Sequence, residues 1–142
     1  MPITCDTTNI ETNDAPRTVL VVEDNLVNQR VSAAMLKRLG FAVELANNGE
    51  EGVSKWEQGQ YVAIIMDCQM PVLDGYSATE RIRQQEISQQ RDRRMPIIAL
   101  TANTLEEDRQ RCFDSGMDDY LTKPVDVKVL GYTLNQWIES AA

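Results

Sequence analysis

Three short runs of this sequence, residues 19–22, 62–66 and 97–100, are apolar at every position. Such runs are typical of central strands that helices cover on both faces of a parallel sheet. Two weaker runs, residues 42–46 and 120–121, suit edge strands, which need less burial. Longer stretches with helical periodicity separate these runs. The pattern predicts repeated βα units around a parallel sheet, an α/β fold.

Five helices are expected between and after the strands. Apolar residues at helical spacing mark the first helix, with Val27, Val31, Met35 and Leu39, and the last, with Val127, Leu130, Leu134, Trp137 and Ile138. The polar segment 84–95 is expected to be a long loop. Five helices and a five-stranded parallel sheet of strand order 2-1-3-4-5 would form a flavodoxin-like, doubly wound fold.

At 142 residues the chain suits one compact domain. We expect residues 17–142 to form it, and residues 1–16, which are mostly polar and acidic, to be a flexible tail or linker. This start lacks the basic residues and the apolar stretch of a secretory signal. No apolar stretch approaches the ~20 residues that a membrane span needs. A cytoplasmic location is therefore the default expectation.

The composition argues against several kinds of site. A net charge of −8 would repel a nucleic-acid backbone. The three cysteines are widely spaced and contain no C-x-x-C pair, so they encode neither a disulfide framework nor a zinc site. The chain has no histidine, which excludes any mechanism that uses an imidazole of its own.

Acidic residues directly follow two of the predicted central strands. Glu23 and Asp24 follow the first strand, and Asp67 follows the third. In a sheet of this strand order, ligands bind beyond the carboxyl ends of the strands, between strands one and three. Carboxylates gathered there would repel one another, and a hard divalent cation with oxygen ligands offsets that repulsion. Mg²⁺ is the natural candidate.

The other strand ends supply a hydroxyl and an ammonium, because the fourth strand ends at Thr101 and Lys123 follows the fifth. A nucleophilic oxygen, a metal and donors for phosphoryl oxygens are what a phosphoryl-accepting site needs. Asp67 is the candidate nucleophile, since a carboxylate is ionised near neutrality without help from a histidine. Each residue alone is more often a cap or turn residue, but five such groups at strand ends favour a functional site.

Four stretches strongly resemble the receiver domain of two-component response regulators. They are VLVVEDN (19–25), MDCQMPVLDG (66–75), ALTAN (99–103) and DDYLTKP (118–124). The residues of these stretches look most like those in the receivers of hybrid sensor histidine kinases. The resemblance implies a domain that takes phosphate from a phosphohistidine on another protein, changes conformation, and later loses the phosphate by hydrolysis.

Carried over position by position, the resemblance makes Asp67 the phosphoacceptor. It implies that Asp24 and Asp67 bind Mg²⁺ directly, together with the backbone carbonyl of Gln69. Glu23 would assist through water. Cys68, next to the acceptor, is expected to be a small side chain that points away from the pocket.

The resemblance also implies how phosphate is held and sensed. Lys123 would bind a phosphoryl oxygen by charge, and the Thr101 hydroxyl would bond another. Tyr120 would then rotate inward and reshape the face formed by the fourth helix, the fifth strand and the fifth helix. Ordinary edge-strand packing is the alternative for Tyr120. The Lys123–Pro124 peptide resembles the cis peptide of the family.

The resemblance implies that the partner is a histidine kinase or a histidine phosphotransfer domain. Direct contact with nucleic acid or with a membrane is not expected, and the sequence leaves open whether phosphorylation drives dimerisation. In a membrane-anchored sensor kinase this domain would belong to the cytoplasmic part. As an isolated domain it is expected to catalyse only its own phosphorylation and dephosphorylation.

Other functions remain as alternatives. The chain could be a free-standing response regulator or, less favoured, an aspartyl-phosphate phosphatase of the haloacid-dehalogenase type. That phosphatase family wants a second aspartate where this chain has Gln69, so a general acid is lacking. A flavodoxin-like cofactor site would need a phosphate loop in place of the Glu23-Asp24 pair. A non-phosphorylated interaction module is disfavoured by the complete set of site residues.

Overall fold

The computed structural model describes residues 17–70, 72–102 and 105–141, and the predicted tail at residues 1–16 lies outside the described residues. Strands and helices alternate along this part of the chain. In order they are β2 (Thr18–Val22), α2 (Leu26–Arg38), β3 (Ala42–Ala46), α3 (Gly49–Gln58), β4 (Ala63–Asp67), α4 (Gly75–Ser88), β5 (Ile97–Thr101), α5 (Glu106–Ser115), β6 (Asp119–Thr122) and α6 (Val127–Ala141). Among the helices so described, none combines the length and apolarity that a bilayer crossing requires.

All strands lie in one five-stranded sheet of order β3-β2-β4-β5-β6, and every neighbouring pair is parallel. The predicted α/β fold and strand order are therefore confirmed. β2 has neighbours on both sides, pairing Val21 with Leu45 of β3 and with Ile65 of β4. The chain order reverses between β2 and β4, so the carboxyl ends of these two strands border the crevice in which such sheets bind ligands.

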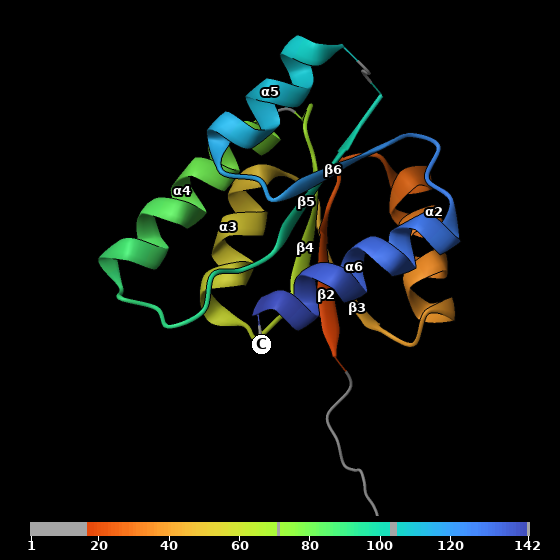
Figure 1. The fold of residues 1–142 in the computed structure, drawn as a ribbon, viewed down its shortest axis with the longest axis horizontal. Helices are drawn as coiled ribbons and strands as arrows, with labels where there is room; N and C mark the ends of the chain where they lie inside the picture. The colour runs from red at the N-terminus through yellow and green to blue at the C-terminus, as the bar shows by residue number, and fades with distance from the viewer. Residues whose placement is uncertain (1–16, 71, 103–104, 142) are drawn as a thin grey trace, which may run out of the picture.

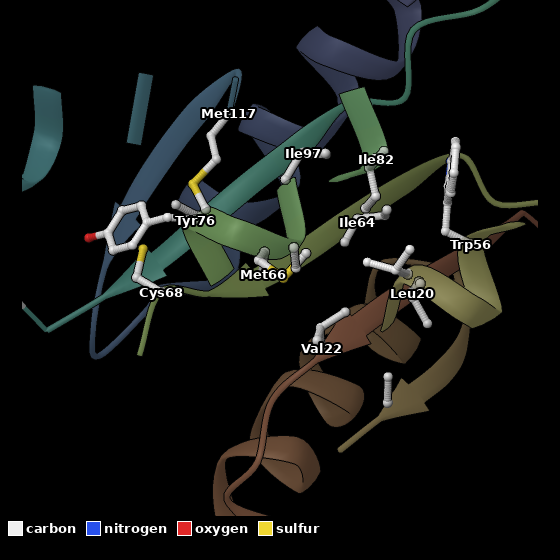
Figure 2. Packing of buried hydrophobic residues seen from close by; sticks show 14 of the residues in the cluster. Leu20, Val22, Trp56, Ile64, Met66, Cys68, Tyr76, Ile82, Ile97 and Met117 are labelled. Carbon is white, nitrogen blue, oxygen red and sulfur yellow. The ribbon is translucent and has the colours of Figure 1, made fainter. Parts of the chain in front are cut away.

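Helices cover both faces of the sheet, with α3, α4 and α5 on one side and α2 and α6 on the other (Figure 1). Successive strand residues point to opposite faces, so each central strand feeds both cores. Leu20 and Ile64 enter the cluster under α3, α4 and α5, where Trp56 also packs (Figure 2). Their sequence neighbours Val21 and Ile65 enter the cluster under α2 and α6. This two-sided burial explains why the central strands are apolar at every position.

Helix α2 presents a different face to the sheet than its apolar stripe predicted. Val27 and Val31 are 67% and 52% exposed, whereas Gln29, Ser32 and Leu36 are buried. The Gln29 amide donates hydrogen bonds to the Glu23 carbonyl at 2.7 Å and to Asn47 Oδ1 at 2.8 Å. These bonds hold a polar side chain against the ends of β2 and β3. The apolar stripe consequently points away from the core near the start of the helix.

Helix α4 is longer than the polar sequence indicated. The expected loop at residues 84–95 is wrong for its first part, because α4 continues to Ser88. Arg83 explains the difference. Its guanidinium donates to Glu86 Oε1 at 2.9 Å, Asp118 Oδ2 at 2.8 Å and the Gly116 carbonyl at 2.8 Å. These polar groups are nearly buried but mutually satisfied, so this end of the helix packs against the turn before β6 without an apolar stripe.

Replacing Arg83 by alanine should lower the free energy of unfolding by about 3 kcal/mol, because Glu86 and Asp118 would remain buried without that partner. Arg81→Ala is the matched control on the same helix. Its pair with Glu50 is exposed on both sides, and such pairs contribute less than about 1 kcal/mol. Urea unfolding followed by circular dichroism measures both variants. An equal loss of unfolding free energy in Arg83→Ala and Arg81→Ala would show that the buried network is not more stabilising than the exposed pair.

Candidate functional site

Three carboxylates meet at the crevice between the carboxyl ends of β2 and β4. Glu23 and Asp24 follow β2, and Asp67 is the last residue of β4. One oxygen from each lies within 4.8 Å of the others. Glu23 and Asp67 are buried, with 1% and 6% of their surface exposed, whereas Asp24 is exposed. The structure thus brings together the acids that the sequence predicted to meet.

Glu23 is held in place on several sides. The Asn25 backbone N–H donates to its Oε2 at 3.1 Å, and the Lys123 ammonium donates to its Oε1 at 3.3 Å. The Gln29 amide binds its backbone carbonyl. Sequence reasoning missed Gln29, because a glutamine inside a helix gives no signal of a partner at a strand end. The sequence could have indicated Asn25, since asparagine is a preferred N-cap residue. Its side chain does accept a hydrogen bond from the Asn28 N–H.

Asp67 has fewer partners and faces the crevice. Its Oδ1 accepts the Gln69 backbone N–H at 3.3 Å and lies 3.5 Å from the Lys123 ammonium. Lys123 therefore lies between the two buried acids and offsets part of their mutual repulsion. The Lys123–Pro124 peptide is cis, as the resemblance implied, and the Lys123 N–H donates to the Thr101 carbonyl at 2.9 Å.

The loop after Asp67 folds back closely on its own strand. The Gly75 N–H donates to the Cys68 carbonyl at 3.1 Å. A Cβ added at Gly75 would collide with the Asp67 backbone oxygen, so this position accepts no side chain. The tight return places the start of α4 directly behind the acceptor strand. Gly75 thus supports the site through the backbone.

The side chain of Cys68 points away from the carboxylates, as expected. It is 1% exposed and belongs to the cluster under α3, α4 and α5, where its Sγ lies 3.7 Å from that of Cys112 (Figure 2). Burial raises the pKa of both thiols. Near neutrality they are therefore protonated and weakly nucleophilic, in contrast to the neighbouring Asp67 carboxylate.

The two predicted switch residues lie on neighbouring strands. Thr101 ends β5 and is 3% exposed, and Tyr120 pairs with Ala99 of β5 from the edge strand β6. The Tyr120 ring is half-buried, edge-to-face with Phe113 at 6.3 Å, and the Arg109 guanidinium lies 5.3 Å from its centroid. Tyr120 therefore packs on α5 in this state. Its rotation stays a prediction.

The chemistry of this donor set suits a hard cation. Oxygen ligands from Asp24 and Asp67 are of the type that Mg²⁺ prefers, and Glu23 adds a further oxygen within reach. Thiolate and imidazole ligands, which favour softer metals, are absent from the described cluster. The adjacent Lys123 ammonium is a hydrogen-bond donor for an anion placed above Asp67. The site can accordingly bind a divalent cation and an oxyanion together.

Comparison with known proteins points to one family. Residues 19–135 match the family model described as the response regulator receiver domain. The hybrid signal transduction histidine kinase K of Dictyostelium discoideum is 40% identical over 124 residues, which cover 85% of this chain and 10% of that protein. The sensor histidine kinase RcsC of Escherichia coli is 38% identical over 121 residues, which cover 85% of this chain and 12% of that protein. This chain thus spans about a tenth of the length of these relatives.

Two similar solved structures carry information about ligands. The receiver domain of sensor histidine kinase PA1611 from Pseudomonas aeruginosa is 50% identical, with a TM-score of 0.79 over 88% of this chain and 99% of that one; a magnesium ion is coordinated in its active site cleft. The receiver domain of Saccharomyces cerevisiae Ssk1 was crystallised with the histidine phosphotransfer protein Ypd1. It is 36% identical, with a TM-score of 0.79 over 92% of this chain and 95% of that one.

Asp24→Asn should raise the stability of the metal-free protein, because it removes one of three crowded negative charges while keeping the shape of the side chain. Asp24 is exposed, so we expect a gain of no more than about 1 kcal/mol. Thermal unfolding in buffer with EDTA measures it. Glu80→Gln, an exposed acid in the middle of α4, is the control and should change nothing. An unchanged or lower melting temperature for Asp24→Asn would contradict the inferred repulsion.

Proposed function

This chain belongs to the response regulator receiver domain family of two-component systems, and on that premise we propose that Asp67 accepts a phosphoryl group from a phosphohistidine on another protein. The convergence of the Asp67, Glu23 and Asp24 carboxylates with the Lys123 ammonium carries this proposal. The histidine would belong to a separate domain, because these 142 residues contain none.

The transfer needs only a well-placed carboxylate oxygen. An Asp67 oxygen attacks the phosphorus as the P–N bond to the donor imidazole breaks, and the imidazole nitrogen leaves with the bonding electron pair. A new P–O bond forms, giving an acyl phosphate on Asp67, and the imidazole leaves neutral because its other ring nitrogen carries a proton. The β4 backbone and the Gln69 N–H orient the nucleophile, so little conformational freedom is lost during the reaction.

We assign Mg²⁺ to the carboxylate cluster, since its oxygen donors fit and a similar receiver domain binds that ion in its cleft. Asp24, Asp67 and the backbone carbonyl of Gln69 would hold it, with Glu23 assisting through water. When bound, the ion neutralises negative charge on the phosphoryl oxygens. Glu23 is buried and has the Lys123 ammonium as a partner at 3.3 Å.

Lys123 and Thr101 would bind the transferred group. The Lys123 ammonium already lies 3.5 Å from Asp67 Oδ1, where it can shift to a phosphoryl oxygen at little cost. The Thr101 hydroxyl would bond another oxygen. We propose that Tyr120 then leaves its packing against Phe113 and Arg109 and turns inward. This movement would change the surface of α5, β6 and α6, a two-state element biased by phosphate.

The partner would be a histidine kinase or a histidine phosphotransfer domain. A hollow of about 360 Å³ adjoins the carboxylates, with Glu23 and Lys123 on one side and Val31 and Met35 of α2 on the other. The exposed apolar residues of α2 beside the site suit a phosphoryl donor that is a protein better than a small-molecule donor. We propose a hybrid sensor histidine kinase, with this domain in the cytoplasm, as the natural context, and the similarity to such kinases supports the first part of this proposal. A free-standing response regulator is the alternative.

Incubation with acetyl phosphate and Mg²⁺ should add the mass of one phosphoryl group to the chain, and Asp67→Asn should abolish the addition because the amide is not a nucleophile. Intact-mass spectrometry measures both. EDTA should suppress labelling of the wild type. Equal labelling of Asp67→Asn would contradict the acceptor assignment. Rapid turnover of a phosphate ester substrate would favour the phosphatase alternative.

Lys123→Ala should slow phosphorylation by about 100-fold, the usual effect of deleting one donor to a developing anion. Lys128→Ala is the control, because that lysine is exposed on α6. The rate of labelling by acetyl phosphate is measured for each, after thermal unfolding has shown that the variants are folded. A Lys123→Ala rate equal to that of wild type would remove this residue from the site.

A further inference from the structure

A second hollow lies at the opposite end of the sheet from the carboxylates. Its volume is about 550 Å³, within the roughly 300–1,000 Å³ typical of small-molecule sites. It forms where α3 leads into β4 and where α4 leads into β5. These strands carry Asp67 and Thr101 at their other ends. A ligand here would not compete with a phosphoryl group on Asp67.

The wall of this hollow is basic in an otherwise acidic chain. Arg91, Arg93 and Arg94 line it together with one acid, Asp92, although the chain has a net charge of −8. Arg94 is engaged by Asp118, at 3.0 Å, and by the Gly116 carbonyl. Arg91 donates to the Gln89 side chain and to the Glu57 carbonyl. Arg93 is exposed and makes no hydrogen bond or ion pair with any residue that the structure describes.

Aromatic side chains complete the hollow, and one of them carries a buried hydrogen-bond donor that lacks an acceptor. Trp56 lines it and is 1% exposed, and its indole Nε1–H is buried without an acceptor among the described groups. Such an orphan donor is costly, and native structures usually supply it with a partner. The Arg91 guanidinium lies 4.2 Å from the centroid of the Trp56 ring. Tyr61 packs so closely on Gly59 that a Cβ there would approach its ring to 2.8 Å.

We propose that this hollow binds an organic phosphate of about the size of a mononucleotide. The guanidinium groups of Arg93 and Arg91 match phosphoryl oxygens in pairs. The organic part would pack against the Tyr61 ring, as flat groups do on aromatic side chains. An inorganic anion alone would leave most of the volume unfilled. A nucleic-acid strand is disfavoured, because this segment holds only three arginines, with Asp92 among them, and the net charge of −8 repels a polyanion.

The test uses adenosine monophosphate as the probe, with the full chain, in isothermal titration calorimetry. EDTA in the buffer prevents any metal from bridging the phosphate to the carboxylates at the other end of the sheet. Binding should weaken as salt is added, and Arg93→Ala should raise the dissociation constant at least about tenfold. Arg30→Ala, an exposed arginine on α2, is the matched control and should bind like the wild type.

Each remaining outcome overturns the proposal. Adenosine binding as tightly as adenosine monophosphate would show that the phosphate is not recognised. Inorganic phosphate binding as tightly would show that the organic part contributes nothing. Equal affinity of Arg93→Ala and wild type would place the ligand elsewhere, and no heat with any probe would mean no site. Labelling of Asp67 by acetyl phosphate should be the same in Arg93→Ala and wild type, which separates this test from that of the carboxylate site.

Discussion

Electrostatic crowding at the crevice is the constraint on which this structure depends. Glu23, Asp24 and Asp67 lie within 4.8 Å of one another, and two of them are buried. Lys123 offsets part of the repulsion from a position between Glu23 and Asp67. One ammonium cannot balance three carboxylates, which supports the proposed binding of a cation at this site.

The same site determines how α2 packs. Gln29 is drawn inward by the Glu23 carbonyl and the Asn47 side chain, and this turns the apolar residues at the start of the helix toward the solvent. A helix whose only task was to cover the sheet would bury Val27 and Val31 instead. The polar contact thus stabilises the end of β2 and leaves an apolar surface beside the proposed acceptor, where the proposed protein donor would bind.

The two ends of the sheet have opposite character, and α5 lies between them. At the amino ends of β5 and β6, Arg83 and Arg94 hold the Gly116 carbonyl at the end of α5. At the other end, α5 follows Thr101, the residue proposed to sense phosphate. One end of the helix is therefore anchored by charge-assisted hydrogen bonds, while the N-cap Leu105 at the other end makes no side-chain capping bond. This asymmetry suits a helix that transmits a change at the acceptor site to its own surface.

The strands, their parallel order and the meeting of the acids could be predicted from the sequence, because continuous apolar runs and the residues that end them are local features whose placement follows from topology. Lys123 lies beside the acids, where it was expected, and the roles of Thr101 and Tyr120 stay predictions. Only the tertiary structure decided which face of α2 is buried, how far α4 extends, and where Arg83, Gln29 and the arginines at 91–94 find their partners. Buried polar groups must be satisfied by partners far away in the chain, and hydrophobic periodicity carries no record of those pairings.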